Sequence, residues 1–180
     1  MPHQTASRIK TSRGGFTTVE LLVTIAIISI LASIAIPSFI TVINNAMASS
    51  TISQLTGDLY RARSEAVKRN RYVLICTRAN DTSCGAGTNW SQGWLVCYDE
   101  NQDAACDAAP ADGSNPNPIV VHQAINSHLL LTGSAAAITY NPDGTQGTGG
   151  AATLTLTGNW TGAVTQIATI AATGNLSKTP

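Results

Sequence analysis

The stretch FTTVELLVTIAIISILASIAIP occupies residues 16–37 and contains a single charged side chain, Glu20. Twenty-one of its residues precede Pro37. An α-helix rises about 1.5 Å per residue, so a helix of this length reaches roughly 30 Å, the thickness of a bilayer's hydrocarbon core. The stretch therefore predicts one membrane-spanning helix over residues 16–37.

The residues before this stretch predict its orientation. Residues 1–15 hold Arg8, Lys10 and Arg13 and no acidic side chain. Basic residues beside a spanning helix favour the cytoplasmic side. A secretory signal is cut after its apolar run, whereas here the apolar run is long enough to span and no small-residue site closes it. We expect residues 1–15 to be a cytoplasmic leader and the part after the helix to be translocated.

The one carboxylate in the apolar run requires an explanation. A charged side chain at the centre of a membrane helix costs about 2.5–3.5 kcal/mol by insertion data, so such residues usually have a partner. Glu20 either lies near the cytoplasmic interface and is solvated there, or it pairs with a cation. Cleavage after Gly15 would free an α-amine at Phe16, which could neutralise the carboxylate of a neighbouring helix.

Residues 15–21, GFTTVEL, with the basic residues before them and Pro37 after them, resemble the class III signal of type IV pilins and type II secretion pseudopilins. The resemblance implies that a prepilin peptidase cuts after Gly15 and that Phe16 is then N-methylated. It implies that Glu20 pairs with a neighbour's terminal amine during assembly, and that the long helix bends or melts at Pro37. A generic signal-anchor is the alternative, because short motifs also occur by chance.

After Pro37 the pattern is first helical and then β. An amphipathic stalk helix is expected over residues 38–71, because apolar residues recur at three- and four-residue steps. These are Ile40, Ile43, Met47, Ile52, Leu55, Leu59, Ala62 and Ala66. Short β-branched or aromatic runs, bounded by Gly, Asn, Asp and Pro, predict strands at 72–76, 94–98, 119–123, 137–140, 152–157 and 164–170. The predicted class is α+β, with a long N-terminal helix packed on an antiparallel β-sheet head over residues 72–180.

The four cysteines lie in one stretch of 31 residues. No C-x-x-C pair or nearby histidine gives them the spacing of a metal site, so no metal is expected. In a head outside the cytoplasm, two disulfides are the natural expectation. The local pairs Cys76–Cys84 and Cys97–Cys106 each close a short loop and are favoured. The two long-range connectivities and free buried thiols stay open as alternatives.

A second resemblance covers most of the chain. Residues 61–69 (RARSEAVKR), 73–76 (VLIC), 93–99 (GWLVCYD) and 141–144 (NPDG) are similar to the GspH/FimT family of minor pilins and minor pseudopilins. The resemblance implies a subunit that first spans the bacterial inner membrane with its head in the periplasm. In the filament it would lie at or near the tip. Its implied partners are other pilins, the prepilin peptidase, the inner-membrane assembly platform and the membrane. On physical grounds Trp94 is expected to be a core anchor.

The sequence offers little support for DNA binding, calcium binding or catalysis. Some members bind DNA through a basic tail resembling Gly-Arg-x-Arg, but here Asn175 and Ser177 stand where the arginines would be, so nucleic acid is not an expected partner. The basic cluster at residues 61–71 is interpreted as a solvated helix face with local ion pairs.

Residues 99–103 (DENQD) resemble the start of a calcium loop without its glycine and glutamate. No catalytic constellation or cofactor motif is found, so the chain is expected not to be an enzyme.

Overall fold

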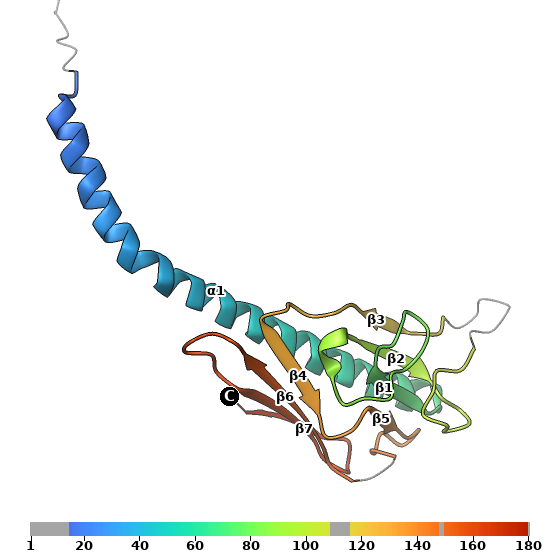
Figure 1. Cartoon of the computed structure of the whole chain (residues 1–180). Coiled ribbons are helices and arrows are strands. Elements are labelled where there is room, and N and C mark those ends of the chain that lie inside the picture. Colours follow the sequence, from blue (N-terminus) through green and yellow to red (C-terminus); the bar gives the residue numbers. More distant parts are fainter. Residues whose placement is uncertain (1–14, 109–115, 148–149, 180) are drawn as a thin grey trace, which may run out of the picture. The chain divides into compact units, whose positions relative to one another are not determined.

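The computed structural model describes residues 15–108, 116–147 and 150–179. Apart from Gly15, the predicted leader lies outside the described residues. The chain divides after Ile40 into two compact units, each of which is described by itself. One long helix, α1 (Thr18–Arg69), contributes residues to both, and the second unit contains every strand. The predicted α+β class, with an apolar start to the helix and an antiparallel head, is confirmed (Figure 1).

Both ends of α1 have sequence-encoded caps. At the start, the Thr17 hydroxyl accepts a hydrogen bond from the backbone amide of Glu20 at 3.2 Å, which satisfies an amide that has no partner within the helix. At the end, Asn70 adopts a left-handed conformation with φ 53°. The amide of Arg71 then donates to the Ala66 carbonyl and that of Asn70 to the Val67 carbonyl. This pair of bonds is the Schellman motif, which ends the helix.

The head packs on one stripe of α1. Residues at steps of four and three are buried there, namely Ala48, Ile52, Leu55, Leu59, Ala62 and Ala66. The predicted stripe was wrong at its first three positions, because Ile40, Ile43 and Met47 are exposed. Their helical spacing is right, but the buried positions of the stripe begin only at Ala48. The sequence pattern shows which face is apolar and not how far the head extends along it.

The first sheet has four antiparallel strands in the order β3-β2-β1-β5. These are β1 (Val73–Thr77), β2 (Trp94–Tyr98), β3 (Val120–His122) and β5 (Ala137–Tyr140). All five residues of β1 and all five of β2 are buried. One face, including Ile75 and Val96, joins the main core with α1, and the opposite face, including Leu74 and Leu95, joins a separate small core that contains the cysteines. Burial on both faces explains why these two strands are continuous apolar runs.

The second sheet has the strand order β4-β6-β7-β8 and is also antiparallel. Its strands are β4 (Leu129–Gly133), β6 (Ala152–Gly158), β7 (Gln166–Ile170) and β8 (Leu176–Thr179). Alternate residues of β6, such as Leu154 and Leu156, are buried in the main core. A short 3₁₀ helix, η1 (Trp90–Gln92), precedes β2 and buries Trp90.

The sequence patterns missed β4 and β8. β4 is built on three leucines, which lack the β-branching and aromatic rings used as the strand signal. β8 contains one apolar residue, Leu176, and its remaining residues are exposed. As an edge strand it requires only one hydrogen-bonded neighbour, so it carries little hydrophobic pattern.

Candidate assembly segment and head surfaces

The first part of α1 is an uncovered apolar surface within its own unit. Phe16, just before the helix, is 79% exposed, and the large apolar residues from Val19 to Ile36 are each at least 50% exposed. The segment is long and apolar enough to cross a membrane. An exposed apolar surface of this size requires lipid or other protein around it.

Glu20 lies in the first turn of α1 and is exposed. A carboxylate there interacts favourably with the positive end of the helix dipole. Thr17 and Glu20 also have the spacing of a capping box. Within the described residues no side-chain partner of the Glu20 carboxylate is found, so its charge is available to a cation from outside this chain. Of the predicted site residues, Gly15 and Phe16 precede the helix and Pro37 lies within it.

Each disulfide joins a strand to the loop that follows it. Cys76 on β1 is bonded to Cys84, and Cys97 on β2 is bonded to Cys106. These are the two local pairs favoured from the spacing, and neither long-range connectivity is present. The alternative of free buried thiols does not apply, because all four cysteines are bonded. The loops cover the face of the first sheet that points away from the main core.

The loop that follows β2 organises itself around Asp99, whose side chain is buried. Its two carboxylate oxygens accept hydrogen bonds from the backbone amides of Asp103 and Ala104, each at 3.1 Å. Burial raises the pKa of Asp99, although these two bonds act in the opposite direction. A carboxylate that already accepts two amide bonds is poorly placed to bind a cation. This arrangement gives the Asp99–Asp103 pattern a structural role in place of the calcium alternative.

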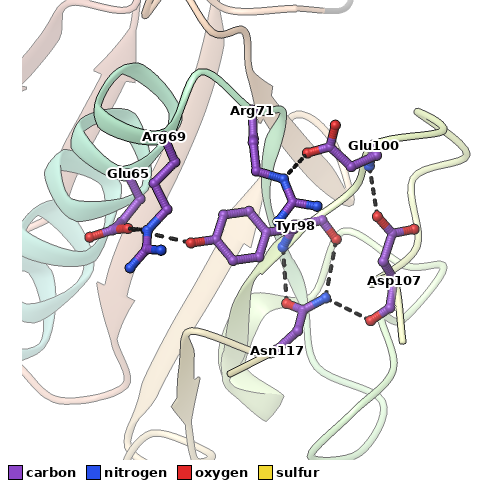
Figure 2. Close-up of polar contacts among 7 residues, drawn as sticks. All are labelled: Glu65, Arg69, Arg71, Tyr98, Glu100, Asp107 and Asn117. Carbon is purple, nitrogen blue, oxygen red and sulfur yellow. Dashed lines mark hydrogen bonds and ion pairs between the residues drawn. The ribbon is translucent and has the colours of Figure 1, made fainter. Parts of the chain in front are cut away.

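A polar network lies where the end of α1 meets this loop (Figure 2). The Glu65 carboxylate accepts from Arg69 Nε at 2.8 Å and from the Tyr98 hydroxyl at 3.4 Å. The guanidinium of Arg71 lies 4.7 Å from the centre of the Tyr98 ring, and its Nε donates to Glu100 at 2.6 Å. The hydrogen bond from Arg69 lowers the pKa of Glu65, whereas burial raises that of Tyr98.

Asn117 completes the network and was not predicted. Its Oδ1 accepts from the Tyr98 amide at 3.0 Å, and its Nδ2 donates to the carbonyls of Tyr98 and Asp107. It therefore connects β2 to the loop that contains Asp107 (Figure 2). Asn117 lies between β2 and β3, in a segment where the sequence patterns predict no strand. Composition carries no signal for a side chain that bonds to backbone groups distant in sequence.

The basic side chains of residues 61–71 bond to several different partners. Arg69 and Arg71 form the ion pairs described above. Arg63 donates to the Gly144 carbonyl at 2.8 Å, to Asn175 Oδ1 at 3.2 Å and to the Thr173 carbonyl at 3.1 Å. Because these cations are already partnered within the head, the cluster does not form a continuous free basic surface. The interpretation as a face with local ion pairs agrees with this geometry.

Trp94 is fully buried, as predicted for a core anchor. Its indole Nε1 donates to Asp58 on α1 at 2.9 Å, and its ring stacks on His122 with centroids 3.8 Å apart. The ring of His122 in turn contacts Gln54 at 2.7 Å. The edge strand β3 is thereby attached to both β2 and α1. The sequence indicated neither Asp58 nor His122, because each contact joins residues far apart in the chain.

The described part of the chain contains no pocket. The polar clusters described above bond within the head, and most of the large exposed apolar side chains lie at the start of α1. This arrangement suits a protein that interacts through surfaces and an exposed helix.

Comparison with known proteins agrees with this picture. Residues 51–174 match the family model described as type II transport protein GspH, and residues 10–36 match the prokaryotic N-terminal methylation motif. The fold is similar to that of the type IV minor pilin FimU of Pseudomonas aeruginosa in two crystal forms. One comparison has a TM-score of 0.56 and 19% identity over 76% of this chain and 91% of FimU. The other has a TM-score of 0.53 and 20% identity, with coverages of 73% and 92%. A search of curated proteins gives no match.

Proposed function

The chain belongs to the GspH family of pilin-like structural proteins, which are not enzymes, and we propose that it is a minor pilin at or near the tip of a type IV pilus. There it primes filament assembly or supports adhesion and motility. The methylation motif and the apolar start of α1 together indicate a membrane-anchored precursor. Family membership implies assembly with other pilins and processing by a prepilin peptidase.

One observation carries the proposal. The chain joins a helix whose apolar first part is exposed and holds a single carboxylate to a head whose fold resembles a type IV minor pilin. An exposed apolar helix can enter a filament only after it leaves the bilayer, so its single carboxylate then requires a partner in the filament. A head without a pocket is suited to contact other proteins through its outer surface.

The processing steps follow from the same motif. A prepilin peptidase would cut after Gly15 and expose the amine of Phe16, which would then be methylated. Glu20 on one subunit would pair with that amine on a neighbour. Pro37 removes one amide donor from α1, so the helix would bend or unwind there as the subunit enters the filament. Before assembly the chain would span the inner membrane once with its head in the periplasm.

The second candidate is a GspH-like minor pseudopilin of type II secretion. The family description favours it, because that family is named for type II transport. Both candidates require the same cleavage, the same anchor and the same head. They differ in the machine into which the subunit is assembled.

A deletion strain distinguishes the two candidates. Loss of surface pili with normal secretion of hydrolases is the expected result, restored by the intact gene. Loss of secreted hydrolases with normal pili would instead show that the chain is a subunit of the type II secretion machine. Mass spectrometry of the mature protein should show Phe16 as the N-terminus, heavier by one methyl group. An intact leader, or a cut beyond Ile36, would contradict both candidates.

A role as a DNA receptor is disfavoured by the position of the tail. Asn175, which stands where a related tail has an arginine, accepts a hydrogen bond from Arg63. Ser177 and Lys178 lie on the exposed edge strand β8, and only Lys178 of the two carries a positive charge. We expect the full chain in detergent micelles to leave duplex DNA unshifted at physiological salt. A strong, salt-sensitive shift would reverse this conclusion.

A further inference from the structure

The two disulfides form a single group of sulfur atoms. All four Sγ atoms lie within 4.8 Å of one another, and Cys84 Sγ is 3.8 Å from Cys106 Sγ although these two cysteines are not bonded. Cys76 and Cys97 come from the adjacent strands β1 and β2, and the other two come from the loops that cover those strands. The fold therefore places four thiol-bearing positions around one point.

We propose that these four cysteines bind one thiophilic metal ion of the zinc class when the chain is in its reduced state. Zinc–thiolate bonds of about 2.3 Å in a tetrahedron require sulfur atoms roughly 3.8 Å apart. The contact between Cys84 and Cys106 already has this length. Once reduced, the two bonded pairs have to separate to a similar distance. The four positions thus satisfy the ligand count and the size of a four-thiolate zinc site.

The surroundings also fit such an ion. Cys76 and Cys97 are fully buried beside Leu74 and Leu95, which exclude water from one side of the group. Cys84 and Cys106 are half-buried, so an ion can enter and its charge stays partly solvated. Four soft sulfur ligands select Zn²⁺, Cd²⁺ or Cu⁺ over Ca²⁺ and Mg²⁺.

The metal-bound and disulfide-bonded forms are alternatives for the same four residues. Binding of Zn²⁺ to four thiols releases up to four protons and leaves four thiolates. Formation of the two disulfides then removes four electrons, which two equivalents of a protein or small-molecule disulfide oxidant accept, and the ion is released. The ion would hold the two loops against the first sheet before oxidation closes them permanently.

Cobalt binding tests the proposal. The full chain, in detergent micelles and reduced with a phosphine, is titrated with Co²⁺. We expect one equivalent to bind and to give the visible absorption of a tetrahedral four-thiolate centre, and Zn²⁺ to displace it. The oxidised chain is the matched control and should give no such absorption. Cys84→Ser and Cys106→Ser, which change only the loop ligands, should each weaken binding at least about tenfold.

The reduced chain could lose its tertiary structure, so near-ultraviolet circular dichroism is recorded in the same titration. Signal from the buried Trp90 and Trp94 that is lost on reduction and recovered with one equivalent of Zn²⁺ would support the proposal. The absence of Co²⁺ absorption in the reduced chain would overturn it. Binding that leaves an unfolded chain unfolded, or that both loop variants leave unchanged, would also overturn it, since neither outcome requires the folded arrangement of sulfurs.

Discussion

The Nε atom of Arg63 on α1 donates a 2.8 Å hydrogen bond to the carbonyl oxygen of Gly144, a residue 81 positions later in the chain. The same guanidinium reaches the turn between β7 and β8 through Asn175 and Thr173. One side chain of the helix therefore fixes two turns of the head. From the sequence alone Arg63 belongs to a basic surface cluster. In the structure its side chain holds parts of the head together.

Arg63→Ala should lower the free energy of unfolding of the head by about 2–4 kcal/mol. The substitution removes three hydrogen bonds from a charged donor, and the Gly144 carbonyl lies in a partly buried position. Denaturant unfolding in detergent micelles, followed by tryptophan fluorescence, measures the change. Arg61→Ala is the matched control, because Arg61 is exposed and should have an effect within about 0.5 kcal/mol. Equal losses in both variants would contradict the structural role of Arg63.

Gly174 contacts the same turn and gives a second prediction. It has φ 77°, and a Cβ at this position would collide with the Gly144 carbonyl oxygen. Gly150 has a similar φ of 84° with open space around it. Gly150→Ala should therefore cost only the left-handed penalty of about 1–2 kcal/mol, whereas Gly174→Ala should cost about 1–3 kcal/mol more. The difference between the two unfolding free energies isolates the close contact, and a difference near zero would mean that the two turns are not packed together.

These contacts show which features the sequence could predict. The apolar run, the helical stripe from Ile52 to Ala66 and the continuous runs of β1 and β2 are local patterns, and each appears as predicted. The roles of Arg63 and Asn117 could not be read, because each depends on backbone carbonyls or amides of residues distant in sequence. Nearly every residue has the same backbone carbonyl and amide. The sequence therefore does not indicate which of these groups a given side chain will hydrogen-bond.

The cysteines illustrate the same limit. Their local spacing favoured the two disulfides that the structure contains. The same spacing gave no reason to expect all four sulfurs in one group, because that proximity arises from the pairing of β1 with β2. Local loops could be predicted, but the position of one loop against another required the fold.

Glu65 should make the head's stability depend on pH in the acid range. The hydrogen bond from Arg69 lowers the pKa of Glu65 below its ordinary value of 4.5. A lowered pKa means that the unfolded chain takes up the proton first as pH falls. The stabilisation is therefore fully present above about pH 5 and is lost as pH falls through the lowered pKa.

Glu65→Gln tests this dependence. At pH 7 the variant should be less stable than the natural chain by about 1 kcal/mol, and the difference should shrink toward pH 3. Glu100→Gln is the comparison, since its ion pair with Arg71 is more exposed, at 42% of the Glu100 side chain, and should contribute less. Unfolding curves at several pH values give both differences. A Glu65→Gln difference that is the same at pH 7 and pH 3 would contradict the assignment.

Glu20 has two structural explanations that one pair of variants can separate. The amide of Glu20 bonds to Thr17 at the start of α1, and its carboxylate lies near the positive end of the helix dipole. If helix capping were its main role, Thr17→Ala should reduce incorporation into filaments at least as much as Glu20→Gln. The reason is that the alanine removes a helix cap worth about 1 kcal/mol. Glutamine at position 20 leaves the Thr17 contact intact and is itself accepted in a capping box.

If the carboxylate instead pairs with the amine of a neighbouring Phe16, the order reverses. Glu20→Gln should abolish incorporation into filaments while leaving cleavage after Gly15 and membrane insertion unchanged, since removal of the charge leaves the neighbour's ammonium unpaired in an apolar contact. Thr17→Ala should assemble close to the normal level. Immunoblots of sheared filaments and of membrane fractions, with the mature N-terminus verified by mass spectrometry, measure each step separately. Normal incorporation of Glu20→Gln would show that Glu20 serves the helix end and not assembly.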